Sequence, residues 1–383
     1  MTAIMVSSTL NNPTQIPADA VKVRFLDLRV LDADYRAEIH EAVERVLLHG
    51  RFIMGPEHDA FEDAIADFCQ TPFAVGVGSG SDALYLSLRT LDLQPGDEVI
   101  TTPLTWVATT NAIVLAGGTP VYADVADDYN IDADTIEDRI TPKTRAILLV
   151  HFTGQMCDMD KIMAIATKHG IDVIEDSAQA FGATYNGKPA GSLGTMGCFS
   201  MNPMKIMNAF GEAGAVTVGD EARRDRLQSL RYAGTINKEN CVTPSINGRL
   251  DTIQAAMLLV NLKHLPAKIE ARRTFASIYT SELSGIVGTP PLHNDRDHIY
   301  YSYTINADDR DGLMAHLRAD GIETKIQHPI LMPDHDAYKG RFDADIPGAR
   351  KLIERIVCIP CHEHMTEDEA AHVIASIKAF YGA

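Results

Sequence analysis

The sequence predicts an α/β fold, with a mostly parallel central sheet in a large α/β/α domain and a smaller α+β domain at the C-terminal end. From Val99 onward, short apolar runs alternate with segments of helical periodicity, which is typical of repeated βαβ units. After Ser245 this alternation is lost, and helices and strands follow without a βαβ rhythm. We therefore expect a large domain over residues 1–262, including an N-terminal segment, and a small domain over residues 263–383.

The elements of the large domain can be assigned in chain order. An amphipathic helix over residues 35–50 stops at Gly50, and its apolar face is formed by Tyr35, Ile39, Val43, Val46 and Leu47. Four apolar runs follow as strands, at residues 99–101, 120–125, 146–150 and 171–174. Their near-continuous Val, Ile and Leu content fits strands that are buried on both faces of a parallel sheet. Between the last two strands, residues 156–169 have helical spacing and stop at Gly170.

The C-terminal part begins with a long helix. This helix starts near Asp251, runs through Lys263 and continues past Pro266 toward residue 273. Three further elements follow: an alternating strand over residues 298–305, a helix over residues 309–320 and a closing helix over residues 367–381.

Composition bounds the class of protein. The chain has 383 residues, of which 45% are hydrophobic and 22% charged, as in a soluble globular protein of two domains. The formal net charge of −18 argues against nucleic acid or an anionic membrane as a general partner. No window reaches the roughly 18 apolar residues of a membrane span, and residues 1–19 are polar, without the apolar run of a secretory signal. We expect a cytoplasmic protein.

The six cysteines are scattered and do not resemble a disulfide framework, so we expect free thiols. Cys358 and Cys361, with His362 and His364 close by, have the spacing of a metal knuckle or a haem attachment site. A second ligand pair for zinc is missing, and so is the secretion that haem attachment requires. We interpret this segment as a strand and turn, and we expect no metal site.

Two side chains, Lys205 and Asp176, have the chemistry of a covalent cofactor site. Lys205 ends the stretch 196–205, and Asp176 follows an apolar strand, at whose carboxyl end ligands bind in open parallel sheets. An amine can form a Schiff base with pyridoxal phosphate, and a carboxylate can keep the pyridine nitrogen of this cofactor protonated. Alone, Asp176 would be interpreted as a loop-capping aspartate, but neighbouring motifs favour the cofactor.

Residues 78–82 precede a predicted helix over residues 83–88, and the amide-rich start of such a helix can bind a phosphate. Gly76-Val-Gly78 also begins a dinucleotide pattern, but Ser81 stands where the third glycine would be, so a single phosphate is favoured. Trp106, the only tryptophan, directly follows a strand, where its ring could stack on a cofactor. A place in the core is the alternative for Trp106.

Taken together, the chain resembles the DegT/DnrJ/EryC1/StrS sugar aminotransferases, a branch of the fold type I pyridoxal phosphate enzymes, almost from end to end. The matching segments are Phe52–Glu57, Ser79–Leu84, Gly96–Val99, His151–Gln155, Glu175–Ala180, Phe199–Lys205, Asn247–Arg249 and Ile253–Ala256. So many ordered matches are far more specific than a single motif.

The resemblance implies a role for each of several residues. Lys205 would form the internal aldimine, Asp176 would pair with the pyridine nitrogen, Gln179 would lie near the ring hydroxyl, and Trp106 would stack on the ring. The phosphate would be held by Ser81, Asp82 and Ser200, together with the partner subunit's Asn247. A homodimer with shared active sites follows from this last contact.

The resemblance also implies an activity. The family transfers an amino group from an amino acid, commonly L-glutamate, to a nucleotide-linked keto-deoxy sugar in amino-sugar biosynthesis, with the lysine carrying the proton. Some relatives replace the lysine by histidine and carry out dehydration, so Lys205 indicates transamination. The segment after Lys205 resembles relatives that aminate C3 more than those that aminate C4.

Departures from the family pattern leave the substrate open. Residues 201–204 lack an aromatic that is often present there, and Gln327 and His328 occupy positions that often approach the sugar. Tyr185 and Arg249 are further candidates, each of which could equally be structural. His151 either supports Asp176 or is a core histidine with satisfied hydrogen bonds. A pyridoxal phosphate-dependent sugar dehydratase or isomerase, and a non-catalytic regulatory protein that binds the cofactor, remain the alternative functions.

Overall fold

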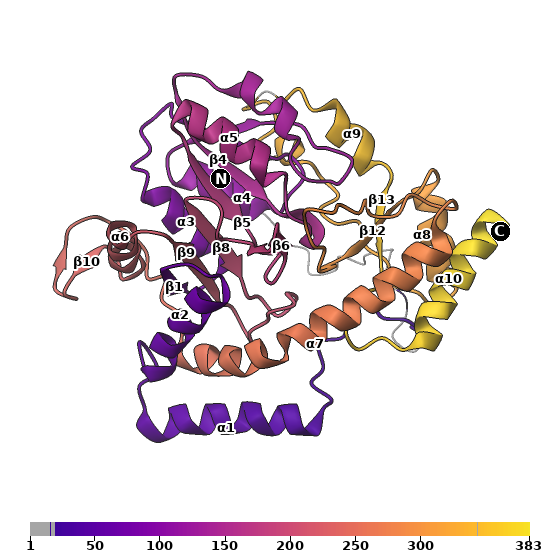
Figure 1. The fold of residues 1–383 in the computed structure, drawn as a ribbon, viewed down its shortest axis with the longest axis horizontal. Coiled ribbons are helices and arrows are strands. Elements are labelled where there is room, and N and C mark those ends of the chain that lie inside the picture. The colour runs from indigo at the N-terminus through magenta and orange to yellow at the C-terminus, as the bar shows by residue number, and fades with distance from the viewer. Residues whose placement is uncertain (1–15, 17–19, 343) are drawn as a thin grey trace, which may run out of the picture.

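The computed structural model describes residues 16, 20–342 and 344–383 (Figure 1). Residues 1–19, for which the sequence predicts no secretory signal, lie outside the described residues except for residue 16. Within the described part of the chain, no helix combines the length and apolar character needed to cross a bilayer.

A mostly parallel seven-stranded sheet forms the centre of the large domain, with the strand order β1-β9-β8-β5-β4-β2-β3. Only β9 runs antiparallel to its neighbours. The predicted fold class is therefore confirmed. The strands of the sheet are β1 (Phe73–Val77), β2 (Glu98–Thr101), β3 (Thr119–Tyr122), β4 (Thr144–Val150), β5 (Asp172–Asp176), β8 (Met196–Ser200) and β9 (Gly214–Val218).

Helices cover both faces of this sheet (Figure 1). One face packs against α3 (Gly80–Arg89), α4 (Val107–Leu115) and α6 (Glu221–Arg231). The other face packs against α2 (Pro56–Phe68), α5 (Met159–His169) and the first turns of α7 (Thr252–Leu283). Adjacent residues of a strand point to opposite faces of the sheet. Leu148 belongs to the core on the side of α3, α4 and α6, and Ile147 belongs to the core on the side of α2, α5 and α7. Both faces are buried, as the apolar runs predict.

Local signals place the ends of several helices. In α1 (Ala33–His49), the Asp32 carboxylate accepts from the amide of Tyr35 at 2.8 Å, and Gly50 ends the helix in the left-handed region at φ 68°. Leu47 was expected on the apolar face of this helix but is 53% exposed, so that prediction is wrong. The face is narrower because α1 packs mainly along α7, against which Ile39 and Val46 are buried.

Helix α7 joins the two parts of the molecule (Figure 1). It spans 32 residues without interruption at Pro266, and it crosses the predicted boundary between residues 262 and 263. Its second half packs with α8 (Arg310–Ala319), α10 (Glu367–Tyr381) and the antiparallel pair of β12 (Tyr303–Asn306) and β13 (Ile356–Ile359) in a second core. The division into domains at this position stays a prediction.

Two segments pack with the part of the molecule to which they do not belong in sequence. Val23 forms a bridge with Ile322, so the N-terminal segment pairs with the C-terminal part. Conversely, α9 (Pro347–Ile353) packs with Tyr122 and Phe152 of the large domain. Two short hairpin pairs complete the strands: β6 (Thr184–Tyr185) with β7 (Lys188–Pro189), and β10 (Thr235–Ile236) with β11 (Asn240–Cys241), the latter projecting from the body in Figure 1.

The predicted strand over residues 298–305 forms only in its second half, as β12. His298 instead bridges Gln155, the amide of Ile299 donates to the carbonyl of Gly154 at 3.0 Å, and Tyr300 has a left-handed backbone at φ 51°. The predicted strand is too long at its start because His298 and Ile299 pair with a loop of the large domain rather than with β13.

The cysteine segment adopts the predicted strand and turn. Cys358 lies within β13, Cys361 is buried shortly after it, and the six cysteines are free thiols. No cluster of three or more potential metal ligands occurs among the residues that the structure describes.

Candidate functional site

A cavity of about 710 Å³ opens at the carboxyl ends of β4, β5 and β8. The structure brings eight of the residues singled out from the sequence together in its lining: Ser81, Trp106, Asp176, Gln179, Ser200, Lys205, Gln327 and His328. Four others do not line it in this chain: Asp82, Tyr185, Asn247 and Arg249. The eight residues come from five separate segments of the chain, so it is the fold that assembles the cavity.

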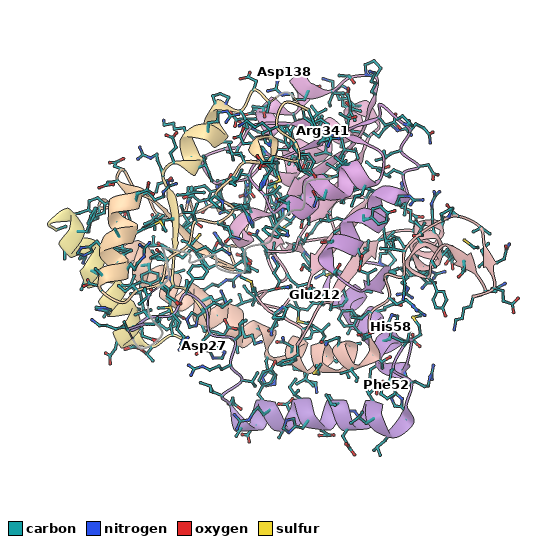
Figure 2. All side chains as sticks on the ribbon, turned by 180° about the vertical axis from the view of Figure 1, so that it is seen from behind. Asp27, Phe52, His58, Asp138, Glu212 and Arg341 are labelled. Atoms are coloured by element: carbon teal, nitrogen blue, oxygen red, sulfur yellow. The ribbon has the colours of Figure 1, made fainter. Side chains whose placement is uncertain are left out.

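Lys205 lies on the loop between β8 and β9. The amide of Met201 donates to the carbonyl of Ala213 at 2.8 Å, which closes the loop, and the amide of Lys205 donates to the carbonyl of Asn202 at 2.8 Å. Its Nζ atom lies over the ring of Tyr301, 4.6 Å from the ring centroid. The loop returns along the start of α7 to Glu212, which is labelled in the rear view of Figure 2 and also lines the cavity.

Asp176 ends β5 with its carboxylate buried at the cavity wall. One carboxylate oxygen accepts from the Thr109 hydroxyl at 2.9 Å, and the other accepts from the amide of Ala178 at 3.2 Å. Burial raises the pKa of Asp176, while the bonds from Thr109 and Ala178 and the positive charge of Lys205 act in the opposite direction. The carboxylate therefore has acceptor capacity left on the cavity side for a positively charged N–H group.

The preceding carboxylate, Glu175, points to the other side of the strand. It accepts from the amides of Gly191, Leu193 and Gly194 at 2.9, 2.8 and 2.5 Å, and from the ring of His151 at 2.9 Å. His151 is fully buried and accepts from the amide of Cys157 with its other nitrogen, at 3.1 Å. Of its two interpretations, the structure supports the satisfied core histidine, since its ring bonds to Glu175.

The start of α3 forms an anion-binding corner of the cavity. The helix begins at Gly80, three residues earlier than predicted, and the hydroxyl of its N-cap Ser79 accepts from the amide of Asp82 at 3.1 Å. The amides of Gly80 and Ser81 precede any helical acceptor and remain available to a ligand. A Cβ atom on Gly80 would lie 2.4 Å from the Cβ of Ser200, so only glycine lets Ser200 close this corner.

Trp106 is 59% exposed and lies at the cavity wall, so the alternative of a core tryptophan is wrong. Its ring centroid is 5.6 Å from that of His328. Burial, together with the charges of Lys325 and Lys205, lowers the pKa of His328 to about 3, which keeps this imidazole neutral at neutral pH. Gln179 accepts from the amide of Thr153 at 2.8 Å, which leaves its NH2 group for the cavity.

Two of the substrate candidates lie elsewhere. Tyr185 is buried in β6, where its hydroxyl is 3.4 Å from the carboxylate of Asp158, which supports the structural interpretation. Arg249 donates to the side chain of Asn247 at 2.7 Å and stacks over the ring of Tyr232. Asn247 itself is exposed on the surface of the chain.

The sequence reasoning missed several residues of the cavity: Thr109, Glu212, Tyr301, Lys325 and His335. Thr109 follows Trp106 by one helical turn, so a helix assigned there could have found it. Tyr301 and Lys325 reach the cavity only through the packing of the C-terminal part on the large domain. No local signal points to them.

The sequence of this chain is similar to those of known proteins. The sequence profile of the DegT/DnrJ/EryC1/StrS aminotransferase family matches residues 33–378. The dTDP-3-amino-3,4,6-trideoxy-alpha-D-glucose transaminase of Streptomyces venezuelae is 38% identical over 366 residues, which cover 94% of this chain and 97% of that protein. A protein of Geobacillus stearothermophilus named pleiotropic regulatory protein is 36% identical, covering 94% of this chain and 99% of its own length.

Two solved structures are also similar to this chain. The crystal structure of S. venezuelae DesV in complex with a ketimine intermediate has a TM-score of 0.91 at 38% identity, covering 94% of this chain and 99% of DesV. NtdA from Bacillus subtilis with bound cofactor PMP has a TM-score of 0.88 at 29% identity, covering 95% of this chain and 86% of NtdA.

Proposed function

The chain belongs to the DegT/DnrJ/EryC1/StrS aminotransferase family, and from this premise we propose that it transfers an amino group from L-glutamate to C3 of a nucleotide-linked keto-deoxy sugar. It is a pyridoxal phosphate-dependent sugar aminotransferase. The observation that carries the proposal is the convergence of Lys205, Asp176 and the start of α3 on one cavity.

The residues of the cavity fit the cofactor. The amides of Gly80 and Ser81, with the hydroxyl of Ser200, would hold the phosphate, and Asp176 would face the ring nitrogen. The exposed ring of Trp106 offers an apolar plane for stacking. When bound, pyridoxal phosphate supplies an electron-withdrawing ring that stabilises the carbanion left when the donor loses a proton.

The protein side chains then have distinct tasks. Asp176 would stabilise a positive charge on the ring nitrogen, because the carboxylate is buried and the electrostatic interaction there is stronger than in water. Lys205, once its amine is free, would take the proton from the α-carbon of the donor and deliver it to the cofactor. In the second half of the reaction the same side chains would act in the reverse order on the keto sugar, which would leave as an amino sugar.

The choice of substrate rests on two lines of support. The S. venezuelae relative is named for a 3-amino sugar, and the segment after Lys205 resembles relatives that aminate C3. Gln327 and His328 lie at the cavity wall, where they would meet the sugar. The neutral His328 imidazole can donate or accept a hydrogen bond without repelling a cationic amine.

A homodimer is part of the proposal. The exposed Asn247 does not line the cavity of its own chain, which fits a residue that completes the phosphate site of the partner. Each active site would then need both subunits, related by a twofold axis.

Thr109 allows a test of how Asp176 works. In a Thr109→Val variant, the carboxylate loses a hydrogen bond, so its raised pKa rises further and less of it is ionised at a given pH. We expect kcat to fall by roughly threefold at neutral pH and by more at lower pH. A pH profile of kcat checks this, with Thr110→Val as control, since the Thr110 hydroxyl faces Tyr122 instead. A parallel profile for both variants would contradict the role of Thr109.

The proposed reaction is tested by separate half-reactions. The cofactor-loaded protein is mixed with L-glutamate until its absorption changes completely, freed of 2-oxoglutarate, and then mixed with individual nucleotide-linked keto sugars. We expect a 3-keto sugar to restore the spectrum and to yield an amino sugar that contains 15N from labelled glutamate. Release of a dehydrated sugar without 15N would favour the dehydratase, and no spectral change with any amino acid would favour the regulatory protein.

A further inference from the structure

Tyr301 is the side chain in contact with the reactive lysine. The Nζ atom of Lys205 lies over its ring, 4.6 Å from the centroid, which is within the range of a cation–π interaction. The ring also lines the cavity on the side of the C-terminal part of the chain. No role was expected for Tyr301 from the sequence.

The backbone around Tyr301 is held in an unusual conformation. Tyr300 has a left-handed backbone at φ 51°, which is unfavourable for a non-glycine residue and persists only where surrounding contacts enforce it. The ring of His298 stacks on that of Tyr300 with 4.0 Å between centroids. This turn interrupts the predicted strand and directs the next side chain to the cavity.

Arg272 of α7 fixes this turn from behind. Its buried guanidinium donates to the carbonyls of Tyr300 and Tyr301 at 3.2 and 3.3 Å and to the carbonyl of Cys361 at 2.9 Å. The same guanidinium is neutralised by the carboxylate of Glu363 at 2.6 Å. A buried ion pair that satisfies three carbonyl groups gives Tyr301 a defined position relative to Lys205.

The hydroxyl of Tyr301 responds to the neighbouring cations. Burial by itself would raise the pKa of this phenol, but the positive charges of Lys205 and Lys325 outweigh burial and lower the pKa of Tyr301. A hydrogen bond with the side chain of Lys205 is among the causes of this lowered pKa, which places the phenol hydroxyl beside the lysine amine.

We propose that Tyr301 is a positioning residue for Lys205: its ring holds the ε-amino group at the cavity wall, and its hydroxyl shares a proton with that amine. When the proton passes between them, an N–H bond breaks as an O–H bond forms, or the reverse, and no other reactant is needed. The proposal rests on the proposed function for its consequence in catalysis, but the contact itself is a property of the protein alone.

The first test uses the cofactor-free protein. The acylation rate of Lys205 by acetic anhydride is measured against pH by peptide mass spectrometry in the wild type and in Tyr301→Phe. Removing the hydroxyl removes the group that shares a proton with the Lys205 amine, so we expect about threefold faster labelling at pH 8. Tyr279→Phe is the control, because the buried Tyr279 hydroxyl has no hydrogen-bond partner among the residues that the structure describes; its curve should match the wild type.

The second test uses the loaded enzyme. For Tyr301→Phe we expect kcat to fall on the order of tenfold, with KM within about twofold. Superimposed labelling curves for wild type and Tyr301→Phe would overturn the proposal, and so would a raised KM at unchanged kcat. Because labelling needs neither cofactor nor turnover, its failure is distinct from a failure of the proposed function.

Discussion

A Lys205→Ala variant is expected to lose amine transfer by roughly a thousandfold or more, together with the visible absorption that the bound cofactor would owe to a covalent link with this lysine. Lys205 would serve both as the point of covalent attachment and as the group that moves the proton, so a single substitution removes two functions. The rate at which L-glutamate is converted to 2-oxoglutarate, and the spectrum of the reconstituted protein, measure the two losses separately.

Lys168→Ala provides the control, since Lys168 is on the surface of α5, where it pairs with Glu137. It should transfer amine at the rate of the unaltered protein. If Lys205→Ala converted L-glutamate at the original rate, another group would have to carry the proton, and the central assignment would be lost.

Asp176→Asn is expected to lower kcat by about a hundredfold or more, because the neutral amide cannot hold the positive charge on the ring nitrogen. The variant should nevertheless fold well. Burial raises the pKa of Asp176 in the folded state, so its ionised form weakens the cofactor-free protein at pH values above that pKa. Asparagine removes this cost, and we expect an unchanged or higher melting temperature at neutral pH without cofactor.

Glu175→Gln is the matched comparison on the same strand. Glu175 accepts three backbone amides and the ring of His151, so its replacement should lower the melting temperature. A large loss of stability in Asp176→Asn, with kcat preserved, would show that the two adjacent carboxylates had been assigned in reverse.

Much of the fold could be predicted from local patterns. Strands such as β4 and β5 are runs of Val, Ile and Leu, and the closing helix α10 matches its predicted residues 367–381, where Thr366 and Glu369 form a capping box. The order of the strands and the antiparallel direction of β9 depend on contacts between distant segments, and periodicity carries no such information. For the same reason, the strand predicted over residues 298–305 begins only at Tyr303.

The cavity also contains residues that the sequence predicts and residues that it does not. Lys205, Asp176 and Trp106 follow strand ends or lie in motifs that resemble those of a known family, and the structure brings them to one cavity. Tyr301 and Lys325 have no motif, and they reach the cavity because α7 and the C-terminal part pack against the large domain. Their chemistry becomes visible only from distances in three dimensions.

The most direct measurement of the central claim is the place of covalent attachment. The protein is incubated with pyridoxal phosphate, reduced with borohydride and digested, and the modified peptide is identified by mass spectrometry. We predict a single modified residue, Lys205, and no stable modification in Lys205→Ala. Modification of a different lysine, or an unmodified protein, would contradict the account.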